Sequence, residues 1–417
     1  MLFTKAGKPL AATKIKSDKS ALCGSVTTPK DFRAAGVSCG LKEKGPDLAV
    51  IFSDHPCHAA GVFTTNKFKA APVLISRQKL RNGSARGLVL NSGNANACTG
   101  PQGAKDAAEM CNHFARLAQV PEEEIIVAST GIIGMPLPMH KIRAGIENAV
   151  KCLSVNGGEA AAQAIMTTDT KPKHLSCAFE LEADEYHIGA MAKGSGMISP
   201  RLATMIGVFT TDIGIHPQLL HEALKQAADV SFNKLTIDGE MSTNDCVFIF
   251  ANGAGGRHFI SDQNDFYKIF AANLTQLSIE MTKLLAADGE GATKSLTVAV
   301  RGAQTLDEAD KAARAVANSL LVKTAIYGQD ANWGRIFSAL GACEVSFDPE
   351  QVSVELANVL IAQNGQPVAF DKIVMKSALE KNYIPIEISI GSGLFSSTIY
   401  SCDLSHEYVT INAEYHT

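Results

Sequence analysis

Hydrophobic and polar residues follow two different periods along the chain, and together they predict a mixed α/β protein. Short apolar runs that are rich in β-branched residues and bounded by Gly, Asn or Asp are typical of buried strands. Such runs occupy Leu48–Phe52, Gly87–Leu90, Ile125–Ala128, Cys177–Leu181, Thr204–Thr211, Cys246–Ala251, Leu296–Val300, Val352–Leu356, Ile386–Ile390 and Tyr408–Ile411. Apolar residues spaced three and four positions apart are typical of helices that cover a sheet. They occupy Ala104–Leu117, Lys141–Leu153, Gln218–Val230, Gln263–Ala286, Glu308–Asn318 and Lys372–Leu379.

No low-complexity linker and no short-period repeat interrupts this alternation. Because domain boundaries usually fall in such linkers, we expect one compact body. Of the 417 residues, 46% are hydrophobic and 19% are charged, and the formal net charge is −4. The charges are dispersed, so the sequence gives no sign of a nucleic-acid partner. No apolar run reaches the roughly 18 residues that a membrane-spanning helix needs, so no membrane partner is expected either.

The first twenty residues carry five lysines but no apolar stretch, so they do not resemble a secretory signal. The ten cysteines are scattered, without a C-x-x-C pair and without Cys/His spacing that suits zinc. We therefore expect a cytoplasmic protein with reduced thiols and no bound metal. The run DGEGATKS at residues 288–295 lacks the Gly directly before Lys294 that a phosphate-binding loop requires.

Small and polar residues follow or precede several of the predicted strands and helices. They form LNSGNANACTG at 90–100, ASTGIIG at 128–134, TTDT at 167–170, DGEMSTNDC at 238–246 and QDANWGRI at 329–336. Each run taken alone is typical of a turn or a helix cap. Ligands in α/β proteins bind at such strand ends, so the set as a whole predicts a binding site.

The stretch KGSGMISPRLATMIGVFTTD, residues 193–212, joins a Gly- and Pro-containing arm to a predicted strand that begins at Thr204. A threonine hydroxyl is a weak nucleophile and needs a neighbouring base. Its own α-amino group, with a pKa of about 8, can be that base if the Ala203–Thr204 bond is cut. The residues alone also allow an ordinary threonine at the start of a strand.

This stretch resembles the self-cleavage segment of the ornithine acetyltransferase family, the glutamate N-acetyltransferases of arginine synthesis. Further runs resemble the family in the same order along the chain: AAGVFTTNKFKAAPV, LNSGNANACTG, VASTGIIGMPLPMHKI, AIMTTDT, STND, DGEGATK, NSLLVKTAIYGQDANWGRI and YVTINAEY. The resemblance covers roughly Val26 to Thr417. Several independent motifs agree, which makes it specific.

The resemblance implies a role for each matching residue. It implies autocatalytic cleavage between Ala203 and Thr204, with Thr204 as the nucleophile. It implies an oxyanion hole at Thr130 and Gly131, and substrate contacts at Thr167, Lys193, Thr204, Glu290, Asn412 and Thr417. Lys193 suits the α-carboxylate that ornithine and glutamate share. Glu290 suits an ammonium group or can orient the attacking amine.

The implied reaction moves an acetyl group from N²-acetylornithine to Thr204 and then to glutamate, with ping-pong kinetics and no cofactor. Acetyl-CoA is a second donor in some family members, and no residue of this chain decides that property. The implied fold is an α/β/β/α layered sandwich. The chain becomes an alpha fragment, residues 1–203, and a beta fragment, residues 204–417, in one intertwined body. Two copies of each fragment are expected to form a heterotetramer.

The sequence departs from the family pattern at Ser199 and Arg201 before the cut, and at Gln329 and Ala331 near Trp333. Arg201 bears on the cleavage rate. Two other hypotheses stay open. One is an amidohydrolase or aminopeptidase of the same self-processing architecture, with water as the acceptor. The other is an uncleaved, non-catalytic relative that only binds its ligand.

Overall fold

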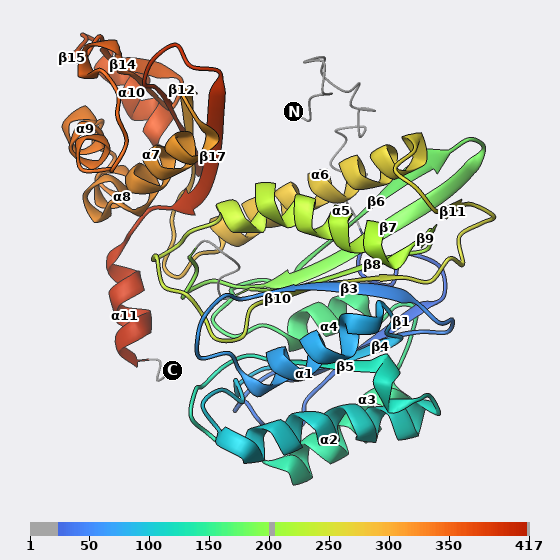
Figure 1. The fold of residues 1–417 in the computed structure, drawn as a ribbon. Helices are drawn as coiled ribbons and strands as arrows, with labels where there is room; N and C mark the ends of the chain where they lie inside the picture. The colour runs from blue at the N-terminus through green and yellow to red at the C-terminus, as the bar shows by residue number, and fades with distance from the viewer. Residues whose placement is uncertain (1–23, 200–204, 415–417) are drawn as a thin grey trace.

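Two β-sheets stack face to face between layers of helices in the computed structural model, which describes residues 24–199 and 205–414 (Figure 1). The first sheet has the strand order β1–β2–β4–β5, with bounds Phe32–Val37, Leu48–Ser53, Gly87–Asn91 and Ile125–Ser129. Every residue of β2, β4 and β5 is buried. The continuous apolar runs arise because both faces of these strands are covered.

The second sheet has the order β3–β10–β8–β7–β6, with bounds His58–Phe63, Cys246–Ala251, Ile206–Thr211, Asp184–Lys193 and Lys173–Leu181. Strands β8 and β10 run parallel, and β7 lies antiparallel to β8. Two short strands, β9 (Gly214–Ile215) and β11 (Phe259–Ile260), pair beside it. The register places the end of β7 next to the starts of β8 and β10, so three chain segments reach one sheet end together.

Helices form the outer layers. Amphipathic helices α2 (Gly100–Ala118) and α3 (Met139–Lys151) cover the outer face of the first sheet, with α1 (Ala71–Lys79) beside them. Helices α5 (Pro217–Val230) and α6 (Asp265–Ala287) cover the outer face of the second sheet. The short helix α4 (Gly158–Ala164) lies between the two sheets, within the apolar core that joins them. The predicted α/β/β/α sandwich is therefore confirmed (Figure 1).

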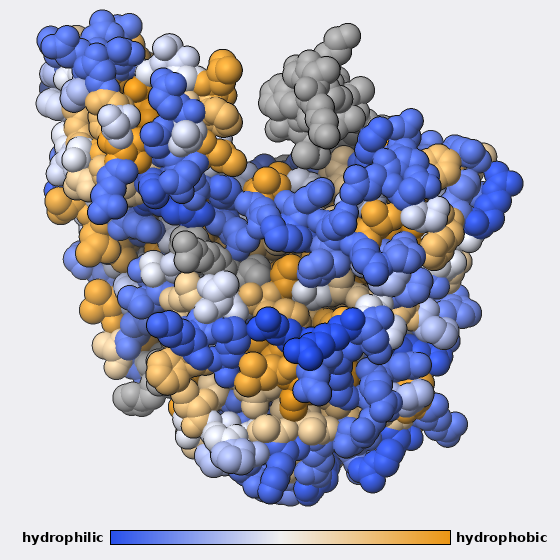
Figure 2. Space-filling view, in the orientation of Figure 1, coloured by the Kyte–Doolittle hydropathy of each residue, from blue (hydrophilic) through white to orange (hydrophobic). Residues whose placement is uncertain are grey.

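A third sheet and its helices form a core of their own. The strand order is β15–β14–β13–β16–β12–β17, with bounds Gln366–Pro367, Val359–Gln363, Ser353–Leu356, Tyr383–Ser389, Ser295–Ala303 and Phe395–Cys402. The helices are α7 (Leu306–Asn318), α8 (Leu320–Tyr327), α9 (Trp333–Gly341) and α10 (Lys372–Leu379). This part stands out as a lobe at the upper left of Figures 1 and 2. Hydrogen bonds such as Thr236 Oγ1 to Asn318 Oδ1, 2.7 Å, fasten it to the sandwich.

The chain leaves this lobe through helix α11, His406–Glu414, which returns toward the sandwich (Figure 1). The predicted strand at Tyr408–Ile411 is therefore wrong. Its β-branched residues suit a strand, but Ser405 Oγ accepts a hydrogen bond from the Glu407 N–H at 3.1 Å and so caps a helix. In the helix, Tyr408 and Asn412 lie on one face, because positions i and i+4 stack. The other predicted strands and all six predicted helices are present in the structure.

Candidate active site

The site lies where the two sheets of the sandwich expose their strand ends to each other. Lys193 ends β7 and pairs with Ile206, the first residue of β8, which in turn pairs with Cys246 of β10. Thr130 follows β5 of the other sheet and forms an isolated bridge with Asn94. The Asn244 side chain ties the two sheet ends together, because it donates to the Ser129 carbonyl at 2.7 Å.

Lys193 is the centre of this cluster, and only 2% of its surface is exposed. Its Nζ donates to the Thr167 hydroxyl at 2.6 Å and lies 3.4 Å from the Thr130 hydroxyl. Its ion pair with Asp169 is loose, at 4.0 Å. Burial lowers the pKa of Lys193, while the charge of Asp169 opposes that change. The structure therefore brings together three of the predicted site residues around one buried ammonium group.

Asp169 holds the residues around Lys193 in place through hydrogen bonds. Its carboxylate accepts hydrogen bonds from the Gly194 N–H at 2.8 Å, the Thr167 N–H at 3.0 Å and Lys173 Nζ at 2.6 Å. Lys173 also forms an ion pair with Asp288, so the buried charged residues are connected in one network. Burial favours the neutral acid, but the charges of Lys193 and Lys173 prevail and lower the pKa of Asp169 to about 2. Asp169 is therefore an anion that holds two buried lysines in place.

Thr130 and Gly131 form the turn after β5. The Thr130 N–H already donates to the Asn91 carbonyl at 3.0 Å, which leaves the hydroxyl as the free donor of this residue. Among the described residues, none accepts a hydrogen bond from the Gly131 N–H. Gly131 has a φ of 128°, and a Cβ on it would lie 2.4 Å from the Gly93 carbonyl carbon. Only glycine fits here, and it presents an N–H group at the edge of the cluster.

Glu290 and Asn412 meet beside the backbone that follows Lys193. Asn412 Nδ2 on α11 donates to Glu290 Oε2 at 2.8 Å. A Cβ on Gly196 would lie 2.2 Å from the Glu290 carboxyl carbon, so the carboxylate packs directly on the backbone after Lys193. Tyr408, one turn earlier on α11, donates to Asp238 at 3.3 Å. Helix α11 thus brings Asn412 from the end of the third-sheet lobe into the predicted site.

Asp245 precedes β10 and is buried beside the start of β8. Its Oδ1 accepts a hydrogen bond from the Met205 N–H at 2.9 Å. Its Oδ2 is buried and has no hydrogen-bond partner among the described residues. Burial raises the pKa of Asp245 well above its usual value, although the charge of Lys193 and the nearby Ser242 hydroxyl oppose that rise. Asp245 is thus a carboxyl group directly beside the residue that follows position 204.

Three predicted residues, Ala203, Thr204 and Thr417, lie outside the described residues. The boundary between the expected fragments 1–203 and 204–417 falls in the same gap. The departures noted at Ser199, Gln329 and Ala331 are described, whereas Arg201 is not. Gln329 and Ala331 belong to the connection between α8 and α9 in the third-sheet lobe.

Sequence reasoning missed the acids that organise the cluster. Asp169, Asp288 and Asp245 lie inside the runs TTDT, DGEG and STND, and those quoted motifs were the only available signal. Lys42, on the connection between β1 and β2, was missed entirely. The asparagines of LNSGNANACTG serve the scaffold instead: Asn91 and Asn96 are buried and donate to backbone carbonyls.

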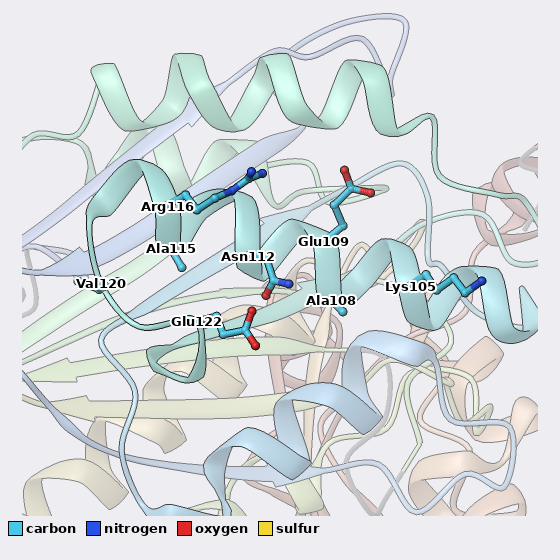
Figure 3. A pocket seen from close by; sticks show the side chains of 8 residues that line it. All are labelled: Lys105, Ala108, Glu109, Asn112, Ala115, Arg116, Val120 and Glu122. Atoms are coloured by element: carbon cyan, nitrogen blue, oxygen red, sulfur yellow. The ribbon is translucent and has the colours of Figure 1, made fainter.

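The arrangement suits the binding of a small anionic substrate at Lys193 and the stabilisation of negative charge near Thr130 and Gly131. Within the described ranges, no group of three or more His, Cys, Asp or Glu residues could hold a metal ion, and all nine described cysteines are free. None of the described helices is long and apolar enough to cross a membrane. The groove in Figure 3 lies along α2 and is lined by eight residues between Lys105 and Glu122, none of which belongs to the cluster around Lys193.

Comparison with known families and curated proteins gives consistent matches. A model described as the ArgJ family matches residues 33–417. The chain is 47% identical over 399 residues to "Arginine biosynthesis bifunctional protein ArgJ" of Symbiobacterium thermophilum, covering 95% of this chain and 99% of that protein. It is 42% identical over 400 residues to the protein of the same name from Caldanaerobacter subterraneus, covering 95% of this chain and 99% of that protein.

A solved structure of ornithine acetyltransferase complexed with ornithine, from Mycobacterium tuberculosis, is 44% identical in sequence to the aligned part of this chain. The alignment covers 42% of this chain and 93% of that chain, with a TM-score of 0.41.

Proposed function

Because the chain belongs to the ArgJ family, we propose that it is an ornithine acetyltransferase of arginine biosynthesis. The acetyl donor is N²-acetylornithine, the acceptor is glutamate, and the products are ornithine and N-acetylglutamate. The family match runs over 33–417, so it includes every residue of the candidate site. The observation that carries the proposal is the buried Lys193 ammonium between the Thr130 and Thr167 hydroxyls.

In the proposed first half-reaction, the Thr204 hydroxyl attacks the acetyl carbonyl of N²-acetylornithine. The C–N bond breaks, an acetyl ester forms on Thr204, and the hydroxyl proton passes to the nitrogen of the departing ornithine. Negative charge develops on the carbonyl oxygen, where the Thr130 hydroxyl and the Gly131 N–H serve as donors. One such donor changes the rate by about 10²–10³.

In the proposed second half-reaction, the amine of glutamate attacks the acetyl ester in the same pocket. The ester bond breaks, and the Thr204 oxygen recovers a proton from the attacking amine. Lys193 pairs with the α-carboxylate that both substrates carry. Since an amide is exchanged for a similar amide, the reaction needs no external energy source. We therefore propose that the enzyme uses no cofactor. The curated relatives are named bifunctional, and we propose acetyl-CoA as an alternative acetyl donor.

The proposed nucleophile needs a free α-amino group as its base, so maturation is part of the proposal. The Thr204 hydroxyl attacks the Ala203 carbonyl, the peptide C–N bond breaks, and the resulting ester is hydrolysed by water. The Met205 N–H, held by Asp245, anchors the chain directly after this bond. We propose that fragments 1–203 and 204–417 stay together, that two copies of each form a heterotetramer, and that the enzyme works in the cytoplasm.

Intact mass under denaturing conditions is the first test. Two pieces of 203 and 214 residues, from 417 − 203 = 214, are expected for the wild-type chain and one piece for Thr204→Ala. Initial rates with varied acetylornithine and glutamate should then give parallel double-reciprocal lines. Intersecting lines, or transfer by Thr204→Ala at the wild-type rate, would contradict the acetyl-enzyme route. A hydrolase would release ornithine at the same rate without glutamate, and family membership does not favour that alternative.

A further inference from the structure

The proposed reaction poses a problem of charge that the residues discussed so far do not solve. After the shared α-carboxylate is bound at Lys193, the two substrates differ in the charge of their side chains. Acetylornithine carries an ammonium group, and glutamate carries a second carboxylate. Glu290 suits the ammonium group, but it would repel a carboxylate in the same position. A site that accepts both substrates therefore needs a cation that is not already neutralised by an acid.

Lys42 meets this requirement. Its Nζ donates to the Met166 carbonyl at 2.9 Å, one residue before Thr167, whose hydroxyl contacts Lys193. In the described part of the chain, no carboxylate forms an ion pair with it, whereas Lys173 pairs with two acids. Lys42 is also only partly exposed, so its charge is not fully screened by water. A neutral carbonyl is a weak partner for an ammonium group, and a substrate carboxylate would replace it favourably.

The backbone at Lys42 is held in place beside the candidate site. Buried Asp47 accepts hydrogen bonds from the N–H groups of Cys39 at 2.6 Å and of Lys42 at 3.0 Å. The stem of Lys42 passes over Gly93, where a Cβ would lie 2.9 Å from the lysine Cγ. Gly93 in turn packs against Gly131, so only Gly93 separates the stem from the turn that carries the free N–H. Two rotatable bonds beyond the lysine Cγ, Cγ–Cδ and Cδ–Cε, let the ammonium group move.

The charges of the site also act on Lys42. Burial lowers the pKa of Lys42, the charges of Asp47 and Asp169 oppose that change, and the charge of Lys193 adds to it. Lys42 comes from the β1–β2 connection, whereas Glu290 comes from the segment after α6 and packs on Gly196. The site thus has a cation and an anion on different elements, and neither forms an ion pair with another described residue. Lys193 contacts Thr130 and Thr167 in the same site.

We propose that Lys42 is the specificity-determining residue for the acceptor: it binds the side-chain carboxylate of glutamate, while Glu290 binds the side-chain ammonium group of acetylornithine. This inference rests on the proposed acetyl transfer. Lys42 leaves the Met166 carbonyl when glutamate enters and returns to it when acetylornithine is bound. One pocket then serves two substrates of opposite side-chain charge without a large rearrangement of the backbone.

The test compares Lys42→Met, which keeps the length of the stem, with the control Lys44→Met, an exposed lysine of the same connection. A charge-assisted hydrogen bond is worth about 1.5–3 kcal/mol, so the KM for glutamate should rise about tenfold to a hundredfold in Lys42→Met. The KM for acetylornithine should stay within about threefold, and Lys44→Met should match the wild type. Equal changes in both KM values, or no change in either, would overturn the proposal.

Two further readouts separate this inference from the proposed function. Ornithine release from acetylornithine without glutamate, in a single-turnover burst, reports the first half-reaction; its absence in the wild type would refute the acetyl-enzyme instead. With glutamine as acceptor, Lys42→Met should act like the wild type, because the amide is neutral. The ratio of kcat/KM for glutamate over glutamine should therefore fall at least tenfold. An unchanged ratio would refute the role of Lys42 even if both variants fold equally well.

Discussion

Replacing Asp169 by asparagine tests whether its charge holds the site together. The substitution keeps the shape of the side chain, but it removes the anion between Lys193 and Lys173. It also places an NH₂ group, which can only donate, next to groups that are themselves hydrogen-bond donors. The pKa of Asp169 falls from 3.8 to about 2, because lysine charges outweigh burial. At about 1.4 kcal/mol for each unit, the anion contributes about 2.5 kcal/mol to the free energy of unfolding at pH 7.

The pH dependence has a definite sign. A carboxyl group whose pKa is lowered by folding stabilises the protein above the unfolded pKa, and this stability is lost as the pH falls through the folded pKa. For Asp169 the window runs from 3.8 down to about 2. The stability difference between wild type and Asp169→Asn should therefore shrink from about 2.5 kcal/mol at pH 7 to about 1.3 kcal/mol at pH 3.

Urea unfolding followed by circular dichroism at both pH values measures this difference. Asp229→Asn is the matched control, because Asp229 pairs with Lys225 at 2.7 Å on an exposed helix face. An exposed pair of this kind contributes less than about 0.5 kcal/mol. If Asp169→Asn cost no more than Asp229→Asn at pH 7, or cost the same at pH 3 as at pH 7, the electrostatic reasoning would be refuted.

Three other substitutions test the remaining parts of the site. Gly131→Ala should lower the thermal midpoint and reduce acetyl transfer at least tenfold, because its Cβ meets the Gly93 backbone at 2.4 Å. Gly134→Ala is the control, since Gly134 also has a positive φ, 84°, but nothing lies within 4 Å of its Cβ; equal thermal midpoints would contradict the clash. Burial raises the pKa of Asp245, so its carboxyl group makes the protein less stable as the pH rises from the usual value through the raised one. Asp245→Asn keeps an acceptor for the Met205 N–H, so the urea midpoint of the variant should rise relative to that of the wild type as the pH increases above 3.8. A difference in midpoint that stays constant with pH would contradict this. Glu290→Gln should raise the KM for acetylornithine about tenfold, whereas the KM for glutamate should stay the same or fall. If initial rates showed that both KM values rise together, a contact of Glu290 with the ammonium group would be excluded.

The elements that could be predicted from the sequence are those whose pattern is local. Strands β2, β4 and β5 are buried on both faces, so each one is a continuous apolar run. Strand order could not be predicted, because the parallel pairing of β8 with β10 depends on the whole sandwich. The third-sheet lobe was not predicted as a unit, since it is joined to the sandwich by packed elements rather than by a polar linker.

The site divides in the same way. Thr130, Thr167 and Lys193 could be named from motifs, and the structure brings them into contact. The acids around them could not be paired from the sequence, because Lys173 and Asp288 are 115 residues apart. The error at Tyr408–Ile411 has a similar cause, since the side chains of α11 are directed by Glu290 and Asp238 in distant parts of the chain.

The arrival of Asn412 from beyond the third-sheet lobe has a consequence for the order in which the molecule assembles. Its contact with Glu290 spans 122 residues, and the contact of Lys193 with Thr130 spans 63. Closing loops of this length costs chain entropy before the contacts compensate for it, so such contacts form late in folding. The proposed reactive centre is therefore among the last features to form. A partly folded chain carries the same side chains without the geometry to react. The proposed chemistry therefore begins only when folding is complete.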